Sequence, residues 1–336
     1  MGVAIFLEAA LGFARWTVVA FVCFAAGLAH GQADWKPDRN VEFIVGAAAG
    51  GANDRIVRAI QNALQSNKLI PVSMSVVNKP GGGQTIAMAY LNTHTGNPHY
   101  LALASSSWMT TIAGARGAGT THRDFTPIVR LFTEFQVFFV AADSPIKSMV
   151  DVRDRLKKDP GSVSFAYSVG VGNPLHISIV DVAAAAGVDS KRVKAVVFDS
   201  GTMSAAQVAG GHLDVGHSSP GSPMPMVQGG KLRYIGVAGP KRIPGPLAEV
   251  PTLREQGLDV LTPVSYVVMA PKGITPAQAA WWEATLVKAL QTDEIKKDIE
   301  RNLWVLDVAG HKELPAQLDA QFERYQKRLA EMGLVK

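Results

Sequence analysis

The feature that most constrains this chain is a repeated alternation of strand-like and helix-like segments joined by glycine-rich turns. In VEFIVGAAAGGANDRIVRAI, residues 41–60, an apolar strand-like run passes through a glycine turn into a helix-like run. In that helix, Ile56, Val57, Ile60 and Leu64 recur at the spacing of one helical face. This alternation predicts an α/β fold with mainly parallel sheets and ligands at the carboxyl ends of strands.

Further segments repeat this pattern. Strand-like runs cover 99–107, 135–145 and 163–168, and others follow towards the C-terminus. In the helix after 163–168, Asn173 suits the N-cap, Pro174 the first helical position and Gly187 the residue after the helix end. Thr275-Pro276 predicts another helix start. A final apolar stripe at helical spacing predicts core packing; it contains Leu318, Phe322, Tyr325, Leu329 and Met332.

The length of the chain and its N-terminal segment predict a two-lobed, exported protein. A chain of 336 residues is long for one compact core, so we expect two lobes. Residues 1–33 resemble a secretory signal peptide, because Arg15 precedes an apolar run and small residues near 31–33 offer a cleavage site. An uncleaved N-terminal anchor is the alternative. The only cysteine, Cys23, would leave with this segment, which excludes disulfides and thiolate chemistry in the mature chain.

Several common kinds of site do not fit the residues. The net charge is +5, but the basic residues are scattered, which argues against nucleic acid. The turn at 46–51 lacks the lysine and hydroxyl of a phosphate loop, since Ala52 and Asn53 follow it. Pro220 stands where a nucleophile elbow needs glycine. No pair of histidines has zinc-ligand spacing with a carboxylate partner, so we expect no metal and no cofactor.

What remains is anion binding by helix N-termini. A helix start carries partial positive charge and free N–H groups, and small residues let a ligand approach the backbone closely. The turns at 46–54 and 167–176 could each hold a carboxylate, and together they would hold one between two lobes. Glycine-rich turns are also common in α/β proteins that bind nothing there.

Several blocks of sequence then match one family in order. FIVGAAAGGANDRIVR resembles the IVPFAAGGGTDxxAR opening of the Bug proteins, the extracytoplasmic solute receptors of tripartite tricarboxylate transporters. VVNKPGGGQTIA, DFTPIVRL, PGSVSFAYSVGVGNPLHIS, GGKLRYIGVAGPKR and EVPTLREQGL continue the resemblance over nearly the whole mature chain.

The resemblance implies a periplasmic binding protein, not an enzyme, of the two-lobed Venus flytrap type. We expect a monomer. Its two α/β lobes, linked by two crossing strands, would close on a small organic carboxylate for a membrane transporter. The crossings resemble QVFFVAA and VSYVVMAP. One lobe would hold residues 34–142 plus 265–336, and the other residues 143–264.

The resemblance also implies the ligand-binding residues. They lie in the turns already described, in a serine pair and in two later loops: Ala48, Ala49, Gly50, Gly51, Asp54, Ser106, Ser107, Tyr167, Ser168, Gly170, Gly172, Asn173, His176, Thr202 and Ser218. Asp54 could accept from a ligand ammonium or hydroxyl, hold a bridging water, or stabilise the first turn of its own helix.

Departures from the family pattern leave the ligand open. Asp199 replaces a family lysine, and Ser218 replaces an acid, which argues against an amino-acid ligand because an ammonium group would want that charge. A lean towards an aromatic acid rests on four aromatic side chains near the expected cleft: Trp108, Phe135, Tyr167 and Tyr266. These residues could equally belong to the core.

Two other functions stay open. The first is a periplasmic hydrolase in which Ser106, Ser107 or Ser168 acts with His176. The second is a sensor domain that presents its ligand-bound form to a membrane kinase, which the sequence does not separate from transport.

Overall fold

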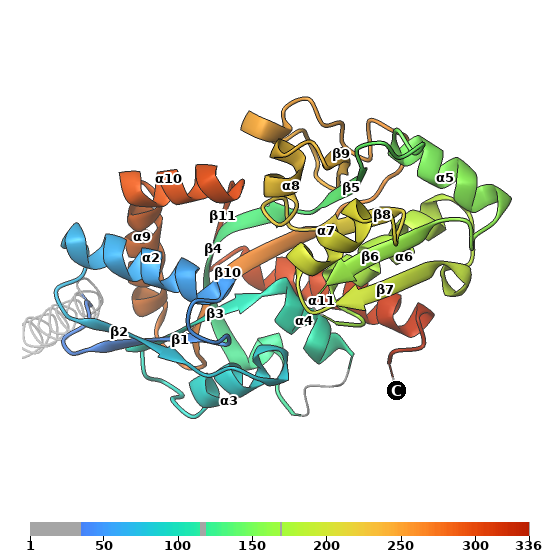
Figure 1. The fold of residues 1–336 in the computed structure, drawn as a ribbon. Coiled ribbons are helices and arrows are strands. Elements are labelled where there is room, and N and C mark those ends of the chain that lie inside the picture. The colour runs from blue at the N-terminus through green and yellow to red at the C-terminus, as the bar shows by residue number, and fades with distance from the viewer. Residues whose placement is uncertain (1–34, 115–118, 169, 336) are drawn as a thin grey trace, which may run out of the picture.

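The computed structural model describes residues 35–114, 119–168 and 170–335; the predicted signal peptide lies outside them. Two β-sheets, each flanked by helices, form two lobes (Figure 1). The predicted two-lobed α/β fold is therefore confirmed. Both sheets are mixed rather than mainly parallel, because strands that link or close the lobes run antiparallel to the βα units.

The first sheet has the strand order β11-β4-β10-β3-β1-β2. Its strands are β1 (Val41–Val45), β2 (Met74–Asn78), β3 (Tyr100–Ser105), β4 (Phe125–Phe135), β10 (Pro263–Pro271) and β11 (Val305–Gly310). The helices of this lobe are α2 (Ala52–Ser66), α3 (Thr85–Asn92), α4 (Ser106–Ala113), α9 (Pro276–Leu290), α10 (Asp293–Asn302) and α11 (Leu314–Glu331). Strand β1 pairs in parallel with β2 and β3, so α2 and α4 both begin at the same edge of the sheet.

The second sheet has the order β7-β6-β8-β5-β9. Its strands are β5 (Val137–Ala141), β6 (Ser164–Ser168), β7 (Lys194–Phe198), β8 (Val215–Ser218) and β9 (Leu232–Val237). The helices are α5 (Met149–Lys158), α6 (Pro174–Ala185), α7 (Gly201–Ala209) and α8 (Met224–Gln228). Short 3-10 turns, η1 (Gly82–Gln84), η2 (His122–Asp124), η3 (Ser190–Arg192) and η4 (Gly245–Leu247), complete the described elements.

The chain passes between the sheets at two adjacent places. Strand β4 ends at Phe135 in the first sheet, and β5 begins at Val137 in the second, so Gln136 is the first crossing point. The return comes at Thr262, which bonds to the second lobe before β10 starts. The lobe division stays a prediction, and strand pairing leads us to move its boundaries to Gln136 and Pro263. A continuous apolar run conceals the change of sheet.

The core residues confirm the predicted helices. The predicted face of α2 is buried against the first sheet, and α6 begins and ends where Asn173, Pro174 and Gly187 predicted. Thr275 caps α9. The predicted stripe on α11 packs into a core cluster around Trp108.

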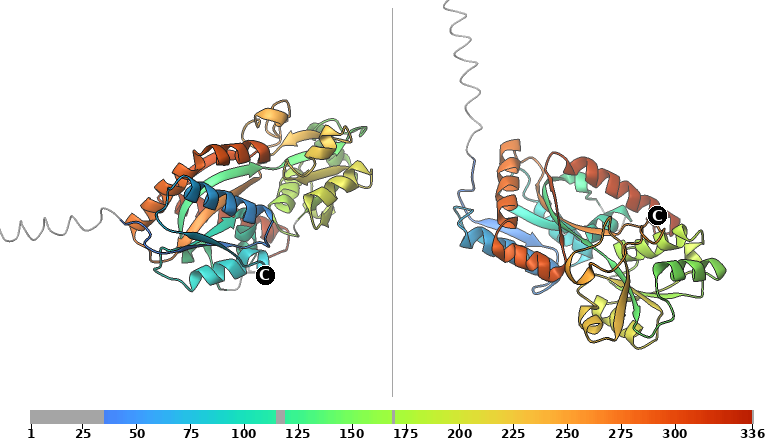
Figure 2. Two further views of the ribbon diagram at one scale, coloured as in Figure 1. Left: turned by 60° about the vertical axis from the view of Figure 1, so that its left-hand side comes forward. Right: turned by 90° about the horizontal axis from the view of Figure 1, so that it is seen from above.

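Helix α11 also connects the lobes. In Figure 2 it runs from the first lobe to the second, beside α6. Arg324 and Arg328 of α11 both bond to the buried carboxylate of Asp181 in α6, at 2.9 and 2.6 Å. The lobes are thus joined by an ion-pair cluster as well as by the two crossings.

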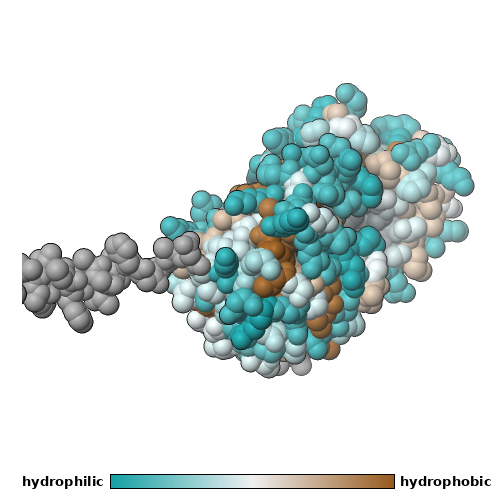
Figure 3. All heavy atoms as spheres, turned by 90° about the vertical axis from the view of Figure 1, so that its left-hand side faces the viewer, coloured by the Kyte–Doolittle hydropathy of each residue, from teal (hydrophilic) through white to brown (hydrophobic). Residues whose placement is uncertain are grey.

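One face of the first lobe is mostly hydrophilic. Figure 3 views the side that carries α2 and α9, where a narrow band of hydrophobic residues interrupts a polar surface. Within the residues that the structure describes, none of the helices is both long enough and apolar enough to cross a bilayer.

Candidate functional site

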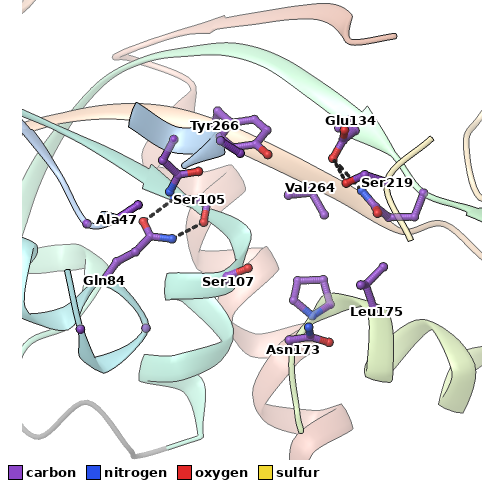
Figure 4. A pocket seen from close by; sticks show the side chains of 17 residues that line it. Ala47, Gln84, Ser105, Ser107, Glu134, Asn173, Leu175, Ser219, Val264 and Tyr266 are labelled. Carbon is purple, nitrogen blue, oxygen red and sulfur yellow. Dashed lines mark hydrogen bonds between the residues drawn. The ribbon is translucent and has the colours of Figure 1, made fainter. Parts of the chain in front are cut away.

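A cavity of about 360 Å³ lies where the two lobes meet (Figure 4). Its walls come from both lobes: Gly46, Ala47, Ala52, Asn53, Gly81, Gly83, Gln84, Ser105, Ser107, Glu134, Gln136, Asn173, Pro174, Leu175, Ser219, Val264 and Tyr266. Most of these residues follow the carboxyl ends of strands or begin helices. The cavity is therefore in the place where an α/β fold presents its ligands.

The start of α2 forms one wall. Gly51 is the N-cap and has no side chain to bond the first turn, and Gly50 has a φ of +79°, a conformation that glycine adopts without strain. The first N–H groups of a helix have no partner inside it, so those of Ala52 and Asn53 are available at the cavity. This wall offers main-chain donors and partial positive charge to an anion.

Asp54 holds this turn in shape. Its side chain is 2% exposed and accepts from the Gly50 N–H at 2.8 Å, from Arg58 Nε at 2.9 Å and from Asn78 Nδ2 at 2.8 Å. Burial alone would raise the pKa of Asp54, but these donors, Arg58 first, lower it to about 2. The carboxylate bonds to its own loop and does not line the cavity, which favours the structural role among those left open.

The serines after β3 face different ways. Ser107 lines the cavity, whereas the Ser106 hydroxyl accepts from the Ser265 N–H at 3.0 Å and packs beneath β10. Ser105 bonds through both its N–H and its hydroxyl to Gln84, which also lines the cavity. Of the predicted pair, only Ser107 reaches the cavity.

The start of α6 forms the facing wall. Asn173 Oδ1 accepts from the His176 N–H at 2.9 Å, and its Nδ2 donates to the Ser168 carbonyl at 2.5 Å. His176 Nδ1 accepts from the Gly172 N–H at 3.1 Å, and its ring stacks on Tyr167. Burial lowers the pKa of His176. The residues 167–176 thus brace the helix start, and Asn173 itself lines the cavity.

The other predicted contacts lie near the cavity without lining it, or further away. Ala48, Ala49, Gly50 and Gly51 lie between the lining residues Ala47 and Ala52. Tyr167, Ser168, Gly170, Gly172 and His176 belong to the loop that braces Asn173. Ser218 is buried beside the lining residue Ser219, and Thr202 is exposed on α7.

Sequence reasoning missed several lining residues. Gln84, Glu134, Gln136 and Ser219 were not expected there, and Tyr266 was expected only as an aromatic neighbour. Glu134 is 7% exposed and accepts from Ser219 Oγ at 2.7 Å and Gln136 Nε2 at 3.1 Å. Burial raises the pKa of Glu134, against the effect of these donors. The sequence signal that could have identified Glu134 is a single acidic residue inside the largely apolar run RLFTEFQVFFV.

The cavity has the chemistry of a binding site for a small polar molecule. No lysine, arginine or histidine is among its described lining residues. Across residues 35–114, 119–168 and 170–335, no group of three or more His, Cys, Asp or Glu side chains could hold a metal ion. Its donors are main-chain N–H groups, hydroxyls and amides.

Solved structures share this fold. A TctC solute binding protein from Polaromonas superposes with a TM-score of 0.77 at 25% identity, covering 88% of this chain and 99% of that one. The R. palustris protein Rpa4515, solved with adipate, gives a TM-score of 0.72 at 22% identity, covering 89% of this chain and 99% of that one. The second likeness establishes the fold alone.

Sequence comparison identifies the family. The UPF0065 protein of the tcbD-tcbE intergenic region of Pseudomonas sp. strain P51 is 27% identical over 307 residues, which cover 90% of this chain and 88% of that protein. The family model described as tripartite tricarboxylate transporter family receptor matches residues 56–313. With its two-lobed fold and a cavity between helix starts, the chain belongs to the receptors of the tripartite tricarboxylate transporter family.

Proposed function

We propose that this protein captures a small organic carboxylate between its lobes and delivers it to a membrane transporter, acting in the periplasm after loss of residues 1–33. One observation carries the proposal: the starts of α2 and α6, one from each lobe, line the same cavity. Closing the lobes would bring both sets of donors onto one anion.

The donors are sufficient for useful affinity. Charge-assisted hydrogen bonds are each worth roughly 1.5–3 kcal/mol, and micromolar binding needs about 8 kcal/mol. The N–H groups of Asn53 and Leu175, the Ser107 hydroxyl and the Gln84 amide are among the candidates around the cavity. Since the receptor must also release its ligand, a site without a buried arginine suits delivery.

We propose binding without catalysis. A serine hydrolase needs its nucleophile hydrogen-bonded to a base. In the described residues no hydrogen bond joins His176 to Ser106, Ser107 or Ser168, and His176 Nδ1 is occupied by the Gly172 N–H. The sensor alternative uses the same binding step and differs only in its membrane partner.

The cavity has one aromatic wall. Of the four aromatic residues that could stack on a ligand, only Tyr266 lines the cavity. Trp108, Phe135 and Tyr167 belong to core clusters and do not line it. One ring could pack on either an aromatic acid or an aliphatic chain. We therefore propose a small carboxylate as the ligand, without choosing between aromatic and aliphatic acids.

A thermal-shift and calorimetry screen tests the proposal. Mature protein would be titrated with mono- and dicarboxylates, adipate among them. A ligand at 100 times its dissociation constant should add about 2.7 kcal/mol of stability. Asn173→Ala should reduce the shift, while Asp259→Asn, at an exposed ion pair away from the cavity, should not. Absence of any carboxylate response, or serine-dependent turnover of a generic ester, would overturn the proposal.

A further inference from the structure

Glu134 is an acidic residue in the wall of a cavity that we propose binds an anion. It is the only residue among the described cavity-lining ones whose side chain can carry a negative charge at neutral pH, and no cationic side chain lines the cavity with it. A ligand bearing only carboxylates would bring negative charge towards a buried acid. At short range and low dielectric that repulsion is strong.

The surroundings of Glu134 suit an ionised carboxylate. Ser219 Oγ and Gln136 Nε2 both donate to Oε2 of Glu134. A carboxylate has about four lone-pair sites, so these two donors leave room for a donor from a ligand. A further hydrogen-bond partner of the Glu134 carboxylate must be a donor. Because Glu134 lines the cavity, a bound ligand can supply that donor.

The position of Glu134 ties this acceptor to lobe closure. Glu134 is the penultimate residue of β4 in the first sheet, and Ser219 follows β8 in the second. Their hydrogen bond of 2.7 Å therefore links the lobes beside the crossing at Gln136. A ligand group on Glu134 would be held where the two lobes meet, away from the donors at the start of α2 (Figure 4).

We propose that Glu134 is a specificity-determining residue that selects carboxylates carrying an ammonium group, whose cation it accepts while the helix starts hold the carboxylate. This inference rests on the proposed function. The loss of an acid at Ser218 argued against an amino-acid ligand. Glu134 of β4 reverses that argument, because it supplies an acid from another strand. Burial raises the pKa of Glu134, and a bound cation would offset that effect.

Matched ligand pairs test the inference. The probes are β-alanine, 4-aminobutyrate, 5-aminovalerate and glutamate, each compared by calorimetry with its deamino partner: propionate, butyrate, valerate and glutarate. The proteins are the mature parent, Glu134→Gln and the control Glu249→Gln, which makes the same charge change at an exposed position of the second lobe. Ser219→Ala is a second variant that keeps the acid but removes its inter-lobe donor.

We expect at least one of the amino acids to bind the parent protein about 10- to 100-fold more tightly than its deamino acid. One charge-assisted hydrogen bond allows a difference of this size. Glu134→Gln should abolish that preference and Glu249→Gln should keep it. Ser219→Ala should reduce the preference for the amino acid. If Glu134→Gln does not fold, this reduction, or its absence, decides the test. Equal or tighter binding of the deamino acids, or an unchanged preference in Glu134→Gln, overturns the inference and leaves the proposed function intact. Absence of binding by every probe also overturns the inference, while the proposed function is decided separately by the wider carboxylate screen.

Discussion

Replacing Asp54 by asparagine should cost the protein a measurable part of its stability. The substitution keeps the shape of the side chain but removes its charge and sets an NH₂ group against one of its three donors. The pKa of Asp54 falls from 3.8 to about 2 on folding. At 1.36 kcal/mol per pKa unit, ionised Asp54 contributes about 2 kcal/mol.

The sign of this contribution gives its pH dependence. Because the folded pKa lies below the unfolded value, the stabilisation is complete above pH 3.8 and is lost as the pH falls through about 2. The difference between parent and Asp54→Asn should therefore be about 2 kcal/mol at pH 7 and should shrink to about half of that at pH 3.

Urea denaturation at pH 7 and pH 3 measures this difference directly. The control is Asp259→Asn, which breaks a pair with Arg254 in which the aspartate side chain is 83% exposed. Exposed pairs contribute less than about 1 kcal/mol. The reasoning is refuted if Asp54→Asn unfolds at the same urea concentration as the parent at pH 7, or if the control loses as much.

Two further predictions concern His217 in the second lobe and Gly46 in the wall of the cavity. His217 is fully buried, stacks on Phe138 and bonds to the Val137 carbonyl, and burial lowers its pKa to about 3. Its protonation opposes folding, so the protein should lose about 2 kcal/mol between pH 6.5 and pH 5, and NMR should show no titration of this ring above pH 5. Gly46→Ala would place a Cβ 2.7 Å from the Gln84 side chain, and it should lower the free energy of unfolding by about 1–3 kcal/mol. Gly221→Ala, with open space around it, should cost far less in the same denaturation assay; equal losses would contradict the packing argument.

Local sequence signals located the helix starts but not the strand residues of the cavity. The N-cap Asn173 with Pro174, and the glycines before α2, carry their own information because capping is decided within a few residues. Glu134 and Tyr266 line the cavity because β4 and β10 pair side by side over a separation of more than 100 residues. Nothing in the neighbourhood of either residue along the chain encodes that pairing.

The change of sheet at Gln136 was hidden for a related reason. Phe135 before it and Val137 after it are both apolar and buried, so one strand-like run covers the end of β4 and the start of β5. The crossing is set by which partners β4 and β5 find, and those partners are distant in sequence. Similarly, Gln84 adopts a φ of +78° that no propensity predicts, and this places its amide against Ser105.

The most direct test of the account is a crystal structure of the mature protein with a carboxylate from the binding screen. We expect the carboxylate between the starts of α2 and α6, within hydrogen-bonding distance of main-chain N–H groups at Asn53 and Leu175. A ligand bound outside this cavity, or held mainly by side-chain cations, would contradict the account.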